Sequence, residues 1–192
     1  MGSPKIAIMY GPGTSCHHET KFAVEYGGGL AEILHIKALI EGEMSLNDYA
    51  GLIIPGGFSW GNHIAPGRIF STSLVARLKD ELQGFIGGSR PILGIGNGAQ
   101  ILMEAGILPR AQVGERTAVA LQNPSATFES RWVNIMGSEG TSPWLEGLSG
   151  RPLKLPVACG EMRLCIRDGV DFQPAFFYSD SSGKTSQELA GL

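Results

Sequence analysis

The first 106 residues alternate short apolar runs with longer segments of mixed polarity. The apolar runs predict β-strands at residues 5–10, 30–36, 49–54 and 90–95. The segments between them predict helices at residues 17–28, 66–86 and 97–105. The longest of these begins at a proline, ends at Gly87-Gly88, and carries apolar residues on one face, namely Ile69, Leu74, Leu78, Leu82 and Phe85. Continuous apolar strands alternating with helices are typical of a parallel sheet covered on both faces.

From Thr117 the pattern changes to short strand-like runs separated by Gly, Pro, Ser and Asp. The runs occupy residues 117–123, 128–136, 153–157, 162–166 and 174–179. We expect antiparallel strands laid against the end of the parallel sheet, and a polar turn in residues 179–192 that enters a final strand. The chain has no internal repeat, low-complexity tract or linker, so we predict one domain over residues 1–192.

Composition narrows the function classes. The chain has 192 residues, 43% of them hydrophobic, which is enough for one sizeable core. Its net charge of −3 and scattered Lys and Arg argue against binding to nucleic acid or an anionic membrane. No apolar run approaches the roughly 20 residues of a membrane span, and we expect a soluble, cytoplasmic protein. Three irregularly spaced cysteines predict reduced thiols, with no disulfide framework, metal site or cofactor.

The segment 93–100, LGIGNGAQ, has the glycine spacing of a nucleophile elbow. Such an elbow reads GxCxG or GxSxG, because the apex residue has a strained backbone and its neighbours must lack side chains. Gly94 and Gly98 keep this spacing, but the apex is Gly96. A plain tight turn is the simplest alternative, and a dinucleotide site is disfavoured because it requires GxGxxG after the first strand. The N–H groups at the start of the following helix can still bind an oxyanion or a carboxylate.

Five segments in order carry a family resemblance. They are GPGTSCHHET near the N-terminus, LIIPGGFSWGN at 52–62, PILGIGNGAQILMEAGIL at 91–108, LQNPSATFESRWV at 121–133 and LPVACGEMR at 155–163. The chain resembles the glutaminase subunit of phosphoribosylformylglycinamidine synthase, a class I (triad) glutamine amidotransferase, over nearly its whole length. The resemblance implies a flavodoxin-like, three-layer α/β sandwich with a mostly parallel central sheet.

Two departures from the family concern the catalytic triad. In the family the elbow reads GICNG, its cysteine attacks the side-chain amide of glutamine, and a histidine and a glutamate follow in an HPE motif near the C-terminus. Here Gly96 takes the place of the cysteine, and no histidine follows His63, so the His-Glu motif is expected to be missing. Glycine has no side chain, so it can neither form the thioester nor act as the base that activates a nucleophile. The resemblance with these departures predicts a catalytically inactive subunit, a pseudoenzyme.

The resemblance also implies a binding pocket. The backbone N–H groups of Gly57 and Asn97 match the family's oxyanion hole beside Gly96, and Gln100 matches a position near the glutamine pocket. Asn123 and Ser125 match further positions near that pocket, although a plain turn explains them equally well. Glutamine or a related carboxylate is the expected ligand, and a synthase-like protein the expected partner.

Two other functions stay open at this stage. An active amidotransferase that supplies ammonia for purine biosynthesis would need a displaced nucleophile, for which Cys16 beside His17 and His18 is the candidate. A loop thiol without catalytic or metal-binding function is the simpler interpretation of Cys16. The third possibility is a structural interaction domain with a filled pocket. For Glu129 and Glu161, solvated or arginine-paired carboxylates are expected rather than an acid pair, and Cys159 and Cys165 are expected to be small core residues.

Overall fold

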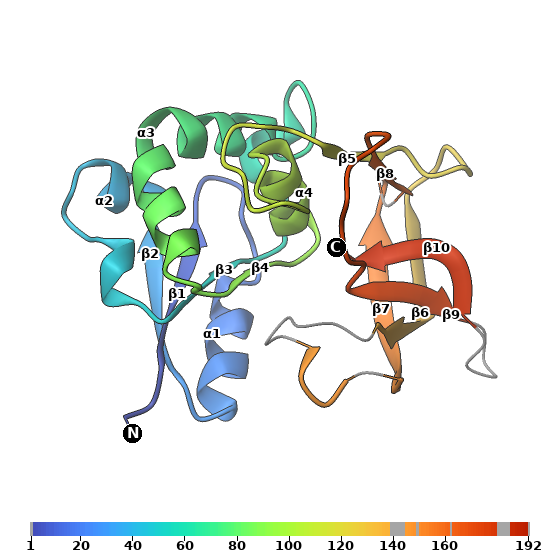
Figure 1. Ribbon diagram of the computed structural model, residues 1–192, viewed down its shortest axis with the longest axis horizontal. Coiled ribbons are helices and arrows are strands. Elements are labelled where there is room, and N and C mark those ends of the chain that lie inside the picture. The colour runs from blue at the N-terminus through green and yellow to red at the C-terminus, as the bar shows by residue number, and fades with distance from the viewer. Residues whose placement is uncertain (1, 139–144, 149, 162, 180–184, 192) are drawn as a thin grey trace. The chain divides into compact units, whose positions relative to one another are not determined.

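The apolar runs of the N-terminal half form one parallel sheet in the computed structural model (Figure 1). Its strands are β1 (Lys5–Tyr10), β2 (Leu30–His35), β3 (Gly51–Ile54) and β4 (Ile92–Gly94), in the order β2-β1-β3-β4. All three pairings are parallel, and Ile8 of β1 lies opposite both Ile33 and Ile53. This is the strand order of flavodoxin-like folds, and the predicted α/β fold with a mostly parallel sheet is confirmed.

The structure describes residues 2–138, 145–148, 150–161, 163–179 and 185–191. The chain divides into two compact units, Met1–Arg116 and Thr117–Leu192. The single domain expected from the sequence stays a prediction.

Four α-helices connect or follow the strands of the first unit. They are α1 (His17–Tyr26), α2 (Ile36–Ile40), α3 (Arg68–Gly87) and α4 (Asn97–Glu104), together with two short 3-10 helices, η1 (Leu46–Asp48) and η2 (Ser59–Asn62). α3 begins two residues later than predicted, after Gly67 in a left-handed conformation. α2 was not predicted, because its sequence continues the apolar run of β2 without a break. No helix in the described residues is both long and apolar enough to cross a membrane.

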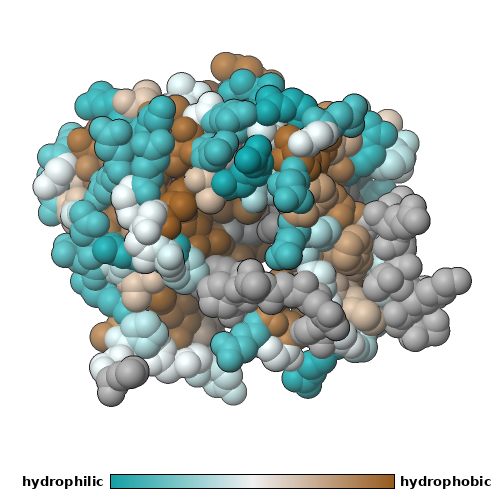
Figure 2. Space-filling view, in the orientation of Figure 1, coloured by the Kyte–Doolittle hydropathy of each residue, from teal (hydrophilic) through white to brown (hydrophobic). Residues whose placement is uncertain are grey.

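The main core lies between the sheet and the helices α2, α3 and α4. Ala7 and Met9 of β1 and Leu52 and Ile54 of β3 share this cluster with residues of those three helices. The predicted apolar face of α3 is largely buried, with Leu74, Leu78, Leu82 and Phe85 in the core and Phe70 added to them. In the view of Figure 2, hydrophilic residues cover much of the outer side of α2 and α3. Both helices are therefore amphipathic, which the sequence pattern predicts for α3 alone.

α1 contributes no residue to this cluster, although it packs against β1 and β2. It therefore covers the other face of the sheet, as a three-layer arrangement requires. Its side chains are poorly sheltered: Phe22 is 68% exposed and Tyr26 86% exposed.

The second unit consists of antiparallel strands, as the change of pattern at Thr117 predicts. β10 (Thr185–Gly191), β9 (Phe176–Ser179), β6 (Glu129–Gly137) and β7 (Pro152–Cys159) form one sheet in this order, and β5 (Ala118–Leu121) pairs with β8 (Arg163–Ile166). β10 confirms the expected final strand, while residues 180–184 of the expected turn lie outside the described residues.

Candidate functional site

The strand-to-helix turn at Gly96 has the backbone geometry of an elbow. Gly96 follows β4 and precedes α4, with φ 54° and ψ −115°, a conformation that L-residues rarely adopt. A Cβ atom at Gly98 would lie 1.9 Å from the Ile54 carbonyl oxygen, and one at Gly94 would lie 2.7 Å from Ala99 Cα. A Cβ at Gly96 would meet only Gly56 Cα, at 3.9 Å. The flanking glycines therefore allow α4 to approach the sheet, while the apex faces open space.

The turn after β3 lies beside this apex. Gly57 has φ 141°, and a Cβ there would lie 2.4 Å from Ser15 N. Ser15 N–H donates to the Gly56 carbonyl oxygen at 3.0 Å, and Phe58 N–H donates to the Gly13 carbonyl oxygen at 2.8 Å. The loops after β1, β3 and β4 thus meet at the carboxyl edge of the sheet. Ligands of doubly wound folds bind at this edge, where the strand order reverses.

Two backbone donors at this edge have no partner within the described residues. The N–H groups of Gly57 and Asn97 donate to no other group there. Asn97 is the first residue of α4, where the aligned peptide dipoles favour an anion. These are the two donors that the family resemblance implies for an oxyanion hole. Gly96 lies next to both of them, because it directly precedes Asn97 in the chain and a Cβ on it would lie 3.9 Å from the Cα atom of Gly56, the neighbour of Gly57.

The side chain of Asn97 connects the elbow to the turn after β3. It is 6% exposed. Its Oδ1 accepts from Ser59 N–H at 3.0 Å, and its Nδ2 donates to Asn62 Oδ1 at 3.0 Å and to Gln100 Oε1 at 2.9 Å. The sequence predicted Asn97 only as a backbone donor and did not single out Ser59 or Asn62. Both residues lie in the GGFSWGN segment, which carries part of the family resemblance, and this was the available signal for them in the sequence.

Asn123 and Ser125, the other predicted pocket residues, belong to the second unit. Asn123 is 3% exposed, and its Nδ2 donates to the carbonyl oxygens of Thr127 at 2.9 Å and Cys159 at 2.8 Å. Ser125 is exposed and donates to Glu129 Oε1 at 2.7 Å. These bonds stabilise the 123–129 turn, which is the structural role left open by the sequence. The pocket role of both residues stays a prediction.

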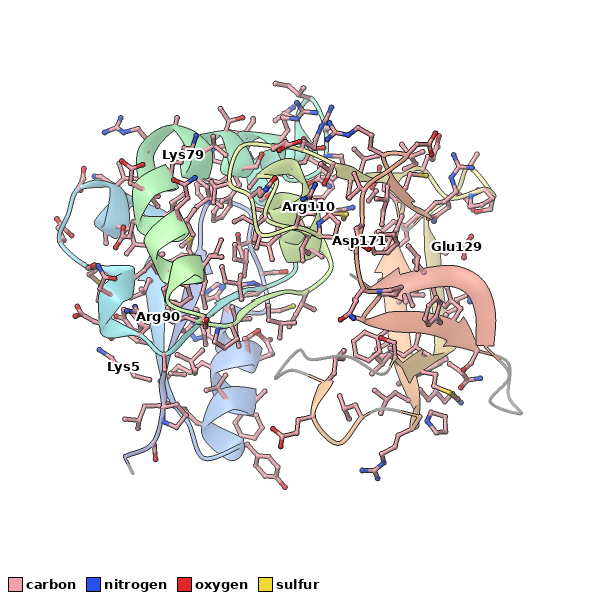
Figure 3. The ribbon with its side chains drawn as sticks, in the orientation of Figure 1. Lys5, Lys79, Arg90, Arg110, Glu129 and Asp171 are labelled. Carbon is pink, nitrogen blue, oxygen red and sulfur yellow. The ribbon has the colours of Figure 1, made fainter. Side chains whose placement is uncertain are left out.

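Glu129 (Figure 3) is paired with arginine, as expected. Arg131 Nε donates to its Oε2 at 2.8 Å. The hydrogen bond from Arg131, and then that from Ser125, lower the pKa of the Glu129 carboxyl. The two cysteines of this unit were expected in the core but are only half-buried. Burial raises the pKa of the Cys159 thiol, whose Sγ lies 3.1 Å from the Glu161 carbonyl oxygen.

Among the residues that the structure describes, the thiol of Cys16 is hydrogen-bonded to neither of the histidines that follow it. Cys16 is exposed, has φ 60°, and places Sγ 3.6 Å from Ser15 Oγ. The ring of His17 instead stacks on Tyr10, with 4.8 Å between ring centroids. No group of three or more His, Cys, Asp or Glu side chains that could hold a metal ion occurs in the described part of the chain.

A flavodoxin-like sheet with a Gly-flanked elbow after β4 fits the class I glutamine amidotransferase fold that the sequence resemblance implies. Comparison with known proteins agrees. The family model of the CobB/CobQ-like glutamine amidotransferase domain matches residues 3–188.

The similar curated proteins are subunits of one enzyme. Phosphoribosylformylglycinamidine synthase subunit PurQ of Methanococcus maripaludis strain C5 is 32% identical over 96% of this chain and 71% of the relative. The PurQ subunit of Pyrococcus furiosus is 34% identical over 96% of this chain and 75% of the relative. The chain belongs to the PurQ family of glutamine amidotransferases.

Solved structures support the same assignment. The PurLQS structure from Thermotoga maritima matches with a TM-score of 0.77 and 26% identity, over 95% of this chain and 78% of the matched chain. Another glutamine amidotransferase from Thermotoga maritima matches with a TM-score of 0.59 and 12% identity, over 100% of this chain and 70% of the matched chain. The second likeness supports the fold alone.

Proposed function

We propose that this chain is a glutaminase-like subunit that has lost amide hydrolysis, binds glutamine or a related carboxylate at the elbow, and acts with a synthase-type partner in purine biosynthesis. Membership of the PurQ family supports the pathway and the class of partner. The matching assembly from Thermotoga maritima is titled PurLQS, which supports a role in a complex of subunits.

The residue at the elbow apex carries the proposal. Hydrolysis by this route requires a nucleophile at the apex to form a thioester, and glycine offers no such group. In a comparable hydrolase, loss of the nucleophile leaves only the roughly 10³- to 10⁴-fold rate enhancement over water that the oxyanion hole and binding provide. This remaining rate enhancement would not sustain useful ammonia release.

The geometry around Gly96 supports retained binding. The Gly57 and Asn97 N–H groups have no partner within the described residues. Such N–H groups are available to a ligand that accepts hydrogen bonds from them, as in an oxyanion hole. A side-chain amide oxygen or a carboxylate oxygen meets this requirement.

A displaced nucleophile is the main alternative. Cys16 lies in the loop that is hydrogen-bonded to the Gly56-Gly57 turn, which places its thiol at the same edge of the sheet. The contact of Cys16 Sγ is with Ser15 Oγ, and the neighbouring His17 ring stacks on Tyr10. A thiol nucleophile of this class requires a general base, and within the described residues no histidine is hydrogen-bonded to this thiol, which supports the inactive subunit over the displaced nucleophile.

The test combines ammonia release with ligand binding. We expect ammonia release from glutamine at the level of buffer, both for the natural chain and for Cys16→Ser, with or without a synthase partner. Titration with glutamine should move the backbone amide resonances of Gly57 and Asn97. Turnover that disappears in Cys16→Ser would establish the displaced nucleophile. Absence of any shift with glutamine or glutamate would refute ligand binding and favour a purely structural domain.

A further inference from the structure

The loop that follows Gly57 has an unfavourable backbone conformation. Within residues 58–64, Trp60, Asn62 and Ile64 have φ of 48°, 52° and 72°. L-residues disfavour this region, asparagine least among these three. The 58–64 loop therefore needs contacts from outside itself to keep this conformation.

The first half of the 58–64 loop is held by the neighbouring loop and by α3. Phe58 N–H donates to the Gly13 carbonyl oxygen at 2.8 Å, and Trp60 N–H donates to the Pro12 carbonyl oxygen at 2.9 Å. The Trp60 ring packs edge-on against Phe70, with 5.3 Å between centroids. The second half of the loop is poorly packed, as the 87% exposed side chain of Ile64 shows.

The Asn97 side chain supplies the contact to both ends of η2. Its Oδ1 accepts from Ser59 N–H, and its Nδ2 donates to Asn62 Oδ1 and to Gln100 Oε1. Both hydrogens of the Nδ2 group are thereby used. The same residue carries one of the two elbow donors, and Ser59 lies two residues after Gly57, which carries the other.

We infer that Asn97 and Asn62 are positioning residues for the anion-binding donors. Their hydrogen bond fixes the 58–64 loop against the elbow, and the loop in turn fixes the Gly57 N–H relative to the Asn97 N–H. The ligand readout of this inference rests on the proposed function.

Two substitutions at residue 62 separate the side-chain bond from the backbone conformation. Asn62→Gly removes the acceptor but accepts a positive φ without strain. Asn62→Asp keeps an acceptor oxygen for Asn97 Nδ2 and tolerates the same backbone region. We expect Asn62→Gly to speed hydrogen exchange of the Ser59 N–H and to weaken glutamine binding by about 5- to 10-fold each, the size of one lost hydrogen bond. Asn62→Asp should match the natural chain in the exchange rate of the Ser59 N–H.

The measurements are amide hydrogen exchange by NMR and titration with glutamine on the full chain, with the urea midpoint as a check on folding. If the Ser59 N–H exchanged at the same rate in Asn62→Gly as in the natural chain, the Asn62–Asn97 hydrogen bond would have no role in holding the loop. Faster exchange with unchanged glutamine affinity would refute its role in positioning the donors. A natural chain that binds neither glutamine nor glutamate would refute the proposed function, while the exchange rates would still decide whether Asn62 holds the loop.

Discussion

Replacement of Gly98 by alanine tests the packing that places the elbow. The added Cβ would lie 1.9 Å from the Ile54 carbonyl oxygen, whereas real Cβ atoms essentially never come within 3.0 Å of another heavy atom. Ile54 is fully buried in β3, and its carbonyl oxygen also accepts from Ile95 N–H at 3.1 Å. Backbone must therefore move by about an ångström on at least one side. Overpacking a core costs about 1–3 kcal/mol and occasionally more, and we expect Gly98→Ala to cost about 3 kcal/mol or more.

Gly84→Ala is the matched control for the same chemical change. Gly84 is an exposed residue within α3, and a Cβ there would meet nothing within 4 Å. Alanine should stabilise this helix position by about 0.5–1 kcal/mol. Urea unfolding followed by circular dichroism should show a midpoint about 1–2 M lower for Gly98→Ala and slightly higher for Gly84→Ala. A Gly98→Ala midpoint equal to that of the natural chain would refute the close approach of α4 to β3.

Two further predictions concern titratable groups. Hydrogen bonds from Lys5 (Figure 3), and then from Tyr49, lower the pKa of Glu32, so its stabilisation is present above the unfolded pKa near 4.5 and is lost as pH falls through the folded value. Because the Glu32 side chain is 39% exposed, Glu32→Gln should cost at most about 1 kcal/mol at pH 7, and urea unfolding that gave the same difference at pH 3 would contradict this. Iodoacetamide should alkylate exposed Cys16 before Cys159, whose thiol is half-buried and has a raised pKa. Peptide mass spectrometry would show equal rates if burial did not protect Cys159.

The parallel sheet could be predicted because buried strands are continuous apolar runs bounded by turns. The same rule concealed α2, whose residues IKALI continue the apolar run LAEILH. η2 could not be predicted, because Trp60 adopts a positive φ only with support from loops distant in sequence. Local patterns therefore specified the main elements, and tertiary contacts specified the irregular ones.

The elbow was predictable from the glycine spacing of residues 94–98, and the structure shows that Gly94 and Gly98 have no room for a side chain. The Asn62–Asn97 hydrogen bond joins residues 35 positions apart and has no local signature. The role of the Gly57 and Asn97 N–H groups was predicted through the family resemblance rather than from spacing. Sequence patterns thus locate the turn, whereas the side chains that hold it in place require the fold.

In the proposed function, the elbow binds a ligand but provides no nucleophile. The most direct measurement is the intact mass of the chain after incubation with isotope-labelled glutamine and an acid quench that preserves thioesters, with Cys16→Ser alongside. We expect an unchanged mass for both proteins at a glutamine concentration that shifts the Gly57 and Asn97 resonances. A labelled acyl adduct on any side chain of the natural chain would contradict it.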